Sequence, residues 1–323
     1  MQMFQLADTQ LIQSPLNYTG GKYKLLPQIL PLFPKEIDCF VDLFCGGCNV
    51  GINIDSKRVI YNDVDEHLFY LFNTFKNLDK DVIFELIFKI IKDYDLSLVC
   101  EHGYDYYHCE SGKGVGSYNK ERFLKLRDDF NHHKQEDYYY YLMLYVLIVY
   151  AFNNQIRFNA KGEYNLPVGK RDFNKKMQRK LSDFIDRLHR QDCRFTCMSF
   201  NEFDVSGLTN RDFVYVDPPY LITCATYNEQ DGWNEDHEKE LLHFLDELNS
   251  KGIRFALSNV LRSKGKENTI LIEWLSNKKY KTHHLDYGYS NSNYQTKDKQ
   301  TKSEEVLITN YDSEYGRILD EYK

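Results

Sequence analysis

The sequence predicts an α/β protein whose doubly wound, Rossmann-like sheet is interrupted by a mostly helical insertion. Apolar, strand-like segments at 38–44 and 58–61 flank a glycine turn, and the second ends on an acidic residue. Helical patterns with polar joints then run from about 77 to 193, and strand-like segments return at 194–200, 212–216, 254–257 and 304–310. A sheet that starts, stops and resumes in this way indicates one α/β domain split by a second domain.

The first strand and turn set the start of the sheet. Residues 38–44 read as a buried strand, 45–48 as a tight turn, and Asn49 as the start of an apolar helix. Residues 58–61 read as the next strand, which ends on Asn62 and Asp63, and a helical pattern begins at Glu66. We therefore expect residues 14–75 and 194–323 to form one discontinuous sheet domain.

The insertion, residues 76–193, is expected to be a second domain. Its run at 138–150 is strongly apolar and predicts a buried helix. Turn residues and two short β-like pieces follow, with a Gly-Glu pair at the tip, so a β-hairpin is expected at about 152–171.

Composition favours a soluble protein of the cytoplasm. Hydrophobic residues make up 42% and charged residues 28% of the 323 positions, and no apolar run reaches membrane-spanning length. The start of the chain has no signal-peptide pattern. The eight Cys are scattered, so free thiols are favoured over a metal or redox site, even at the Cys45–Cys48 pair.

The charge is unevenly distributed. The formal net charge is −7, yet residues 155–180 hold eight basic and two acidic side chains. Because charges are screened beyond about 8–10 Å at cellular salt, the local surplus matters more than the total. It fits either a phosphate-binding surface or a solvated helix face. The high aromatic content, 15%, fits either core packing or base stacking.

A carboxylate and a rigid backbone follow the apolar strand at 212–216. Asp217, Pro218, Pro219 and Tyr220 stand just beyond a strand end, where open α/β sheets bind ligands, although a plain proline turn is the alternative. The Asp217 side chain and the Pro218 carbonyl can accept both N–H bonds of an exocyclic amine. They would direct its lone pair at a methyl group held about 3–3.5 Å away. Tyr220 would stack on the base.

Two further motifs suit a nucleoside-like ligand. The turn Phe44-Cys-Gly-Gly47 lets a ligand approach the backbone, and Asp63, at the end of the next strand, can bind ribose hydroxyls. Lys22, which closes the segment Asn17-Tyr-Thr-Gly-Gly-Lys22, could face a ligand carboxylate or plain solvent.

Taken in order, these motifs resemble the Dam-type (D12 class, alpha-group) adenine-N6 DNA methyltransferases. The resemblance rests on Thr19-Gly-Gly-Lys22, Asp42-Leu-Phe-Cys-Gly-Gly47, Asn62-Asp63 and, after a long insertion, Asp217-Pro-Pro-Tyr220. It runs from about 14 to 311. Segments 152–159 and 162–169 are similar to the family's recognition hairpin, and 305–311 to its last strand. Tyr18 and Cys48 depart from the residues common in relatives, Trp and a small residue respectively.

The resemblance implies an S-adenosylmethionine-dependent methyltransferase sheet with an inserted target-recognition domain. The implied catalytic residues are Asp217, Pro218, Pro219 and Tyr220. The implied cofactor-binding residues are Tyr18, Lys22, Phe44, Gly46, Asp63, Phe200 and Asp217. Asn153, Arg157 and Pro167 fall where the family's hairpin reads DNA.

Charge and hydrogen-bonding capacity support DNA binding independently. Arg157 can pair with guanine O6 and N7, and Asn153 with adenine. Lys170, Lys175 and Lys176 would bind phosphates, which sets register and salt dependence. The loop 290–302, with Lys297, Lys299 and Lys302, is a second phosphate-binding candidate or a disordered hairpin tip.

The expected activity is site-specific methylation of a flipped adenine at N6, and a GATC-like site is one candidate sequence. Cytosine-N4 methylation, RNA adenine methylation and a non-catalytic DNA-binding relative are the alternatives. Double-stranded DNA is the expected partner of a monomer encoded by a bacterium, an archaeon or a phage, with a cognate restriction endonuclease as a candidate partner. No metal is expected, because the His132-His133 and His283-His284 pairs cannot easily face one ion.

Overall fold

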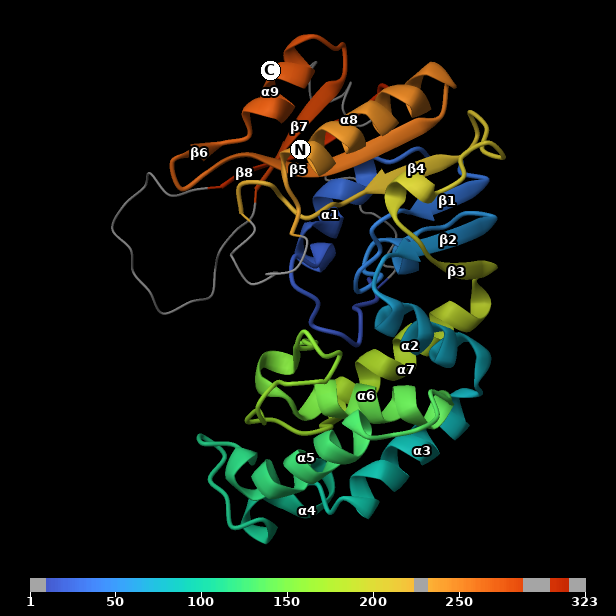
Figure 1. The fold of residues 1–323 in the computed structure, drawn as a ribbon. Coiled ribbons are helices and arrows are strands. Elements are labelled where there is room, and N and C mark those ends of the chain that lie inside the picture. The colour runs from blue at the N-terminus through green and yellow to red at the C-terminus, as the bar shows by residue number, and fades with distance from the viewer. Residues whose placement is uncertain (1–9, 224–231, 287–302, 314–323) are drawn as a thin grey trace, which may run out of the picture. The chain divides into compact units, whose positions relative to one another are not determined.

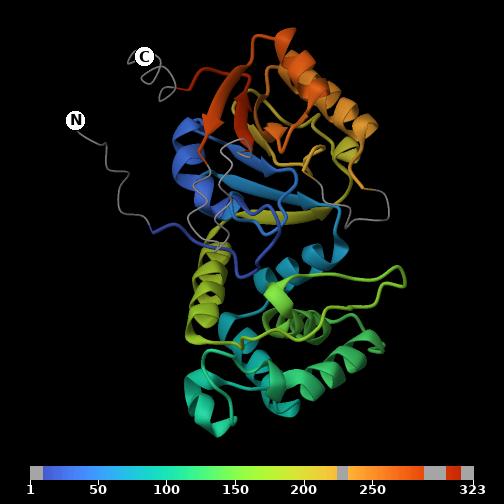
Figure 2. The ribbon, with the colours of Figure 1, turned by 90° about the vertical axis from the view of Figure 1, so that its left-hand side faces the viewer.

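The chain forms two compact units in a computed structural model that describes residues 10–223, 232–286 and 303–313. The first, which we call the helical unit, contains described residues 10–21, 46–53 and 66–191. The second, the sheet unit, contains 22–45, 54–65 and the described residues from 192 onward. Both are drawn in Figures 1 and 2. The helical unit therefore differs from segment 76–193, because it ends at 191 and also takes in residues 66–75 and two short segments from the first part of the chain.

The sheet unit is built on a mostly parallel sheet, as the sequence predicts. Among the described residues the strand order is β3-β2-β1-β4-β5-β8-β7, and β6 pairs with β5. Strands β3 to β5 in this order run parallel, whereas β8 runs antiparallel to both β5 and β7. The strands are β1 (Cys39–Asp42), β2 (Arg58–Asp63), β3 (Cys193–Cys197), β4 (Phe213–Val216), β5 (Arg254–Ser263), β6 (Lys266–Glu267), β7 (Lys281–Leu285) and β8 (Glu304–Thr309).

Alternating side chains divide between the two faces of the sheet. Val41 and Val214 belong to the same hydrophobic cluster as Leu245 of helix α8 (Glu235–Ser250). Their neighbours Phe40 and Phe213 face the other way and contact the ring of Phe33. Both faces are thus covered, as continuous apolar strands require. The remaining elements of this unit are η1 (Lys22–Leu25), α1 (Leu26–Ile29), η2 (Leu30–Leu32), η5 (Phe200–Glu202) and α9 (Thr269–Ser276).

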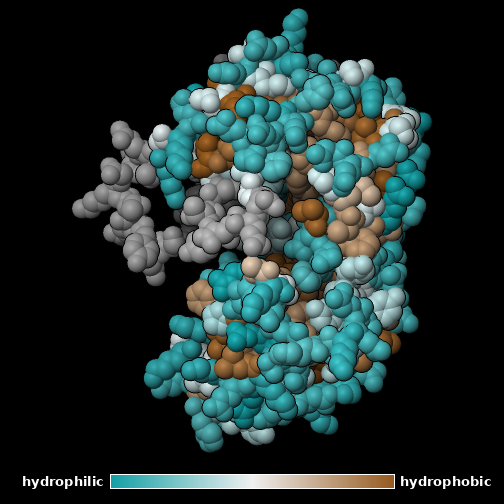
Figure 3. Space-filling view, viewed as in Figure 1, coloured by the Kyte–Doolittle hydropathy of each residue, from teal (hydrophilic) through white to brown (hydrophobic). Residues whose placement is uncertain are grey.

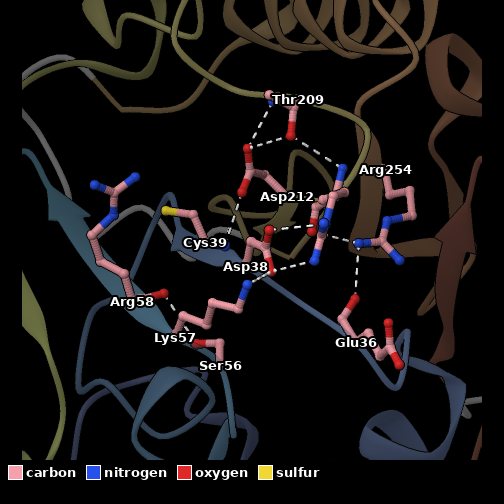
Figure 4. A network of polar contacts seen from close by, with 10 residues as sticks. Glu36, Asp38, Cys39, Ser56, Lys57, Arg58, Thr209, Asp212 and Arg254 are labelled. Carbon is pink, nitrogen blue, oxygen red and sulfur yellow. Dashed lines mark hydrogen bonds and ion pairs between the residues drawn. The ribbon is translucent and has the colours of Figure 1, made fainter.

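A polar network joins the strands at their amino ends (Figure 4). Asp212, which is 6% exposed, accepts hydrogen bonds from the backbone N of Cys39 at 2.8 Å and from the backbone N of Thr209 at 2.7 Å. Asp38 pairs with Lys57 at 2.8 Å and with Arg211 at 2.9 Å. Because these groups precede β1, β2 and β4, the network fixes the edge of the sheet that lies opposite the strands' carboxyl ends.

The expected helix at Asn49 is wrong. The structure has only the three-residue 3-10 turn η3 (Gly51–Asn53) there. Cys48 has a φ of 59°, in the left-handed region, and the Asn49 side chain accepts from the backbone N of Ser14 at 3.0 Å. Asn53 donates to the Asn49 carbonyl at 2.8 Å. Side-chain bonds of this kind replace the backbone ladder of a helix.

The helical unit is arranged around one apolar helix, α6 (Tyr138–Tyr150), as the sequence predicts. Asp137 caps it by accepting from the backbone N of Tyr140 at 3.0 Å. Every residue from Tyr140 to Tyr150 is buried, which an all-apolar helix requires. It is contacted by α2 (Glu66–Asn77), α3 (Lys80–Asp93), α5 (Gly116–Asn131) and η4 (Phe152–Asn154). The unit also contains α4 (Val99–Tyr106) and α7 (Lys175–Arg190).

The predicted hairpin leaves the end of α6. Antiparallel bridges join Ala151 to Val168 and Phe158 to Tyr164, and the backbone N of Asn159 donates to the Glu163 carbonyl at 2.9 Å. These isolated bridges do not extend into regular strands. The ring of Phe158 stacks on His67 with a centroid distance of 3.8 Å.

Many of the aromatic side chains in the described residues are buried in the two cores. Tyr61, Tyr145 and Tyr215 are among the largest side chains that are fully buried, whereas Tyr70, Tyr106, Tyr138 and Phe152 are the exposed aromatics among the described residues. The space-filling view in Figure 3 shows a largely hydrophilic surface with scattered hydrophobic patches. In the described part of the chain, no helix combines the length and apolar character needed to cross a membrane.

Candidate active site

The candidate site lies at the carboxyl ends of the parallel strands. Strand β1 lies between β2 and β4, so the direction of winding reverses beside it. At such a switch point the loops diverge, and open α/β sheets bind ligands there. Asp217 directly follows β4, Phe44 follows β1 and Asp63 ends β2. Three of the residues singled out from the sequence are therefore brought to one edge of the sheet.

Lys22 and Asp217 form a buried ion pair. The Lys22 Nζ lies 2.9 Å from Asp217 Oδ1, and the two side chains are 5% and 17% exposed. Lys22 Nζ also lies over the ring of Tyr220, 4.9 Å from its centroid. The sequence left two surroundings possible for Lys22, solvent or a ligand. In the structure the Lys22 side chain is buried beside the Asp-Pro-Pro-Tyr segment.

Glu305, at the start of β8, completes this cluster. The Tyr220 hydroxyl lies 3.0 Å from Asp217 Oδ1 and 3.3 Å from Glu305 Oε1. Lys22 Nζ lies 3.9 Å from the same Glu305 oxygen. The cluster therefore has two carboxylates, one ammonium and one hydroxyl, all within the sheet unit.

Burial dominates the electrostatics of these groups. It raises the pKa of the Asp217 carboxyl, while the Lys22 ammonium and the Tyr220 hydroxyl act in the opposite direction. The pKa of Glu305 is also raised, first by burial and also by the charge of Asp217, against the effect of Lys22 and Tyr220. Burial and the two carboxylates raise the pKa of the Tyr220 hydroxyl well above its ordinary value. Tyr220 is therefore a neutral phenol, and both carboxyls titrate closer to neutrality than usual.

An aromatic group forms beside the end of β1. The ring centroids of Phe44 and Phe200 are 5.6 Å apart, and each lies 5.8 Å from that of Trp233. The Trp233 indole donates to Glu238 Oε2 at 2.6 Å, and the buried Glu238 also accepts from Asn259 at 3.1 Å. Such flat apolar surfaces suit a nucleobase.

Asn62 fixes the backbone on which these residues stand. Its amide donates to the carbonyls of Leu43 and Met198, each at 3.0 Å, and its own carbonyl accepts from the backbone N of Cys45 at 2.8 Å. The ends of β1, β2 and β3 are thereby joined. Asp63, next in sequence, keeps its carboxylate at this edge, where Oδ1 accepts from the backbone N of Asp65 at 3.1 Å.

Tyr18 and Gly46 contact each other within the helical unit. A Cβ on Gly46 would lie 2.7 Å from the Tyr18 ring, and Gly46 has a φ of 45°. Only glycine therefore fits beneath this ring. A Cβ on Gly47 would likewise lie 3.0 Å from Tyr18 Cβ.

The residues expected to bind DNA lie in the helical unit, and all of them are exposed: Asn153, Arg157, Pro167, Lys170, Lys175 and Lys176. Asn153 has a φ of 56°. Arg157 Nε donates to Asn165 Oδ1 at 2.7 Å, which orients the guanidinium group. The second phosphate-binding candidate, the loop 290–302 with Lys297, Lys299 and Lys302, lies outside the described residues.

Sequence reasoning missed Glu305 and Trp233 as site residues. Glu305 follows another acid, Glu304, and two adjacent acids at the start of a strand are typical of solvent-exposed positions. A weak signal was present, because the apolar run from Val306 leaves Glu305 on the same side of the strand as buried residues.

The described regions contain no disulfide and no cluster of side chains that could hold a metal ion. No disulfide joins the described cysteines, Cys45 and Cys48 included. Within residues 10–223, 232–286 and 303–313, no group of three or more His, Cys, Asp or Glu side chains is arranged to hold a metal ion.

Comparison with known proteins agrees with the motif order. Residues 18–301 match the family described as D12 class N6 adenine-specific DNA methyltransferase. The chain is 44% identical over 306 residues to the type II methyltransferase M.FokI of Planomicrobium okeanokoites, which covers 93% of this chain and 43% of that protein. It is 41% identical over 314 residues to the modification methylase StsI of Streptococcus sanguinis, covering 95% and 44%. The DNA adenine methylase of Escherichia coli K12 is 28% identical over 213 residues, 66% of each chain. The chain thus spans less than half the length of the first two relatives.

Proposed function

The chain belongs to the D12 class of N6 adenine-specific DNA methyltransferases, and we propose that it transfers a methyl group from S-adenosylmethionine to N6 of an adenine in a short duplex DNA site. The observation that carries this proposal is the buried cluster of Lys22, Asp217 and Tyr220 at the switch point of the sheet. It offers a carboxylate and an aromatic ring at the edge where α/β sheets bind ligands.

The chemistry of the surrounding residues fits the cofactor. Lys22 supplies a cation for its carboxylate, Asp63 an acceptor for its ribose hydroxyls, and the rings of Phe44 and Phe200 an apolar surface for its adenine. In the helical unit, Tyr18 and Gly46 provide a ring and a backbone without a side chain. When bound, the cofactor supplies an electrophilic methyl group on a sulfonium.

Asp217 and Pro218 would orient the target amine. Lys22 and Tyr220 both contact Asp217 Oδ1, so among the described residues Oδ2 is the oxygen left for an N–H of the amine. The Pro218 carbonyl, held by Pro219, would accept the other N–H. Tyr220 would stack on the flipped base, an interaction worth roughly 1–3 kcal/mol, which offsets part of the cost of unstacking.

The helical unit is proposed to read the DNA, with its hairpin at about 152–171 as the reading element. The exposed Arg157, oriented by Asn165, suits a bidentate contact with guanine O6 and N7 in the major groove. Asn153 and Pro167 lie on the same hairpin, and the exposed Lys170, Lys175 and Lys176 suit phosphates. We propose that the protein acts as a monomer. Two relatives are named as a type II methyltransferase and a modification methylase, which supports a cognate restriction endonuclease as a partner.

Sequencing of modified bases tests the reaction and the site together. DNA is taken from a methylation-free host that expresses this chain, beside the Asp217→Ala variant, and single molecules are sequenced. We expect N6-methyladenine at one short motif, and none from the variant. Detection of N4-methylcytosine instead would identify cytosine, not adenine, as the target base. No modified base from a soluble wild-type chain would overturn DNA methylation and favour an RNA substrate or a non-catalytic DNA-binding protein.

A further inference from the structure

Methylation of an amine leaves a proton that must be removed, and the cluster around Tyr220 offers a route for it. This inference rests on the proposed function. When N6 attacks the methyl group, an N–C bond forms, and the S–C bond breaks with its electron pair left on sulfur. N6 then carries a positive charge and one hydrogen more than the neutral product.

The Tyr220 hydroxyl lies between two carboxylates. It is 3.0 Å from Asp217 Oδ1 and 3.3 Å from Glu305 Oε1, and both distances are short enough for hydrogen bonds. A phenol has one hydrogen to donate and lone pairs that accept, so it can donate to one carboxylate and, once the other carboxyl group is protonated, accept from that one. The three groups therefore form a continuous line from the methylation site to β8.

We propose that Glu305 accepts the proton released by methyl transfer, through Asp217 and Tyr220. Asp217 takes the proton as the N6–H bond breaks and its electron pair returns to nitrogen. The proton arrives on Oδ2, the oxygen that faces the amine, and the Asp217 carboxyl group turns about its Cβ–Cγ bond to bring it to the position of Oδ1 beside Tyr220. It then moves to the Tyr220 oxygen, while the Tyr220 hydroxyl proton moves to Glu305. The sulfonium has become a neutral thioether and Glu305 a neutral acid, so charge balances without another reactant.

The surroundings of Glu305 suit an acceptor. The residue is 9% exposed, and the groups that face it are Lys22 of η1 and the pair Asp217 and Tyr220 after β4. Its partners on the neighbouring strands, Val260 and Leu285, carry no charge. Burial and Asp217 raise the pKa of Glu305, so its carboxylate binds a proton more readily than an exposed glutamate does.

Tyr220 suits the middle position because it does not need to ionise. Its pKa is raised well above the ordinary value, so a tyrosinate is disfavoured and the hydroxyl must gain one proton as it gives up another. Asp217 touches the reacting atoms in this scheme. Glu305 does not touch the reacting atoms and acts on them only through Tyr220, from which it receives the proton.

The first test is single-turnover methylation with Glu305→Gln, which keeps the shape of the side chain but removes its basicity. We expect the rate near pH 7 to fall on the order of 10²-fold, the usual contribution of a proton-accepting group. The deficit should shrink as pH rises, because hydroxide then takes the proton, while affinities for cofactor and DNA stay unchanged. Tyr220→Phe should lose rate too, and the double variant should lose little more than the worse single variant.

The matched control is Glu304→Gln, which removes the neighbouring carboxylate that pairs with Arg262 at 2.9 Å. Its rate should equal that of the wild type. An unchanged rate for Glu305→Gln, or a loss that is the same at every pH, would overturn the relay while leaving the methylation itself intact. A wild type that transfers no methyl group would instead refute the proposed function and, with it, the relay.

A second readout needs neither cofactor nor DNA. The infrared carboxyl band of Glu305 is identified in the free protein as the band missing from Glu305→Gln, and it is titrated with pH. The Tyr220 hydroxyl lowers the pKa of Glu305 by hydrogen bonding, so Tyr220→Phe should move the midpoint to higher pH. A midpoint that does not move would show that Tyr220 and Glu305 are not coupled, and would overturn the proposal.

Discussion

The ammonium nitrogen of Lys22 lies 2.9 Å from Oδ1 of Asp217, although Lys22 precedes the first strand of the sheet and Asp217 follows β4. Burial of both side chains makes the pair sensitive to the loss of either partner, because a lone charge in this position has little access to water. Burial raises the pKa of Asp217, and the charge of Lys22 opposes part of that rise.

Lys22→Met should therefore move the acid limb of the pH–rate profile to higher pH. Removal of the ammonium raises the pKa of both Asp217 and Glu305, since Lys22 lowers each of them. Asp217 and Glu305 must both be ionised to accept a proton, so the variant would lose activity at a higher pH than the wild type does. Single-turnover rates from pH 5 to 9 measure the shift. Lys24→Met, at an exposed position of the same turn, serves as control, and equal limbs in the two variants would contradict the assignment.

Glu305→Gln should stabilise the folded protein at alkaline pH even as it slows the reaction. The folded-state pKa of Glu305 is raised, so its contribution to the free energy of unfolding falls as pH rises from the ordinary glutamate value through the raised one. Above that window the substitution should gain on the order of 1 kcal/mol. Urea unfolding at pH 5 and pH 8 checks this, and a variant that is less stable at pH 8 would disprove it.

Trp233 should report cofactor binding by fluorescence. The chain has two tryptophans, and Trp274 is held elsewhere by Asp246 at 3.2 Å. In a Trp274→Phe background, S-adenosylhomocysteine should change the emission of Trp233, because Trp233 packs against Phe44 and Phe200. The Trp233→Phe variant, which keeps Trp274, should not respond. Identical titrations of the two variants would remove Trp233 from the cofactor site.

Substitution of Arg157 and substitution of Lys176 should affect DNA binding in different ways. Arg157→Ala should relax the sequence preference by about 1–3 kcal/mol, the worth of one bidentate base contact. Lys176→Ala should weaken binding to all DNA alike and reduce the salt slope by about one ion. Binding is measured against cognate and scrambled duplexes at several salt concentrations. A sequence-selective loss in Lys176→Ala, or an unchanged preference in Arg157→Ala, would reverse these roles.

Asp212→Ala should destabilise the sheet without touching the site. The substitution leaves the buried backbone N–H of Cys39 without its acceptor and also removes the acceptor of the Thr209 N–H (Figure 4), and the buried loss costs about 1–3 kcal/mol. Cofactor affinity below the melting temperature should match the wild type. Asp204→Ala is the control, because Asp204 accepts a similar backbone hydrogen bond from Ser206 at an exposed position. Equal melting temperatures for the two variants would refute the role of Asp212.

The sequence predicted the strands that combine strong apolar runs with clear ends, and it missed those that do not. Strands β1, β2 and β4 end on Asp42, Asp63 and the Asp217 turn, and each was expected near its observed bounds. Strand β7, with the sequence Lys-Thr-His-His-Leu, has little apolar character because it lies at the edge of the sheet. Its position is set by pairing with β8, and the local sequence of a strand does not show which distant strand it will pair with.

The site was predictable where one short segment contains the chemistry, as at Asp217 to Tyr220. It was not predictable where the partner arrives from a distant strand. Glu305 reaches Tyr220 only because β8 lies antiparallel beside β5, and Glu238 becomes a buried anchor only because Trp233 and Asn259 converge on it.

The division of the helical unit into three stretches of chain limits how it can be grafted. Arg187 of α7 donates to the Ile52 carbonyl at 3.2 Å, Gln191 donates to the Gly51 carbonyl at 3.0 Å, and Asn53 is bonded to Ile12. A chimaera that exchanged only residues 66–191 with a relative would cut across these bonds. If the helical unit reads the DNA as proposed, recombinant enzymes with altered target sites would need all three stretches exchanged together, or the exchange confined to the exposed hairpin.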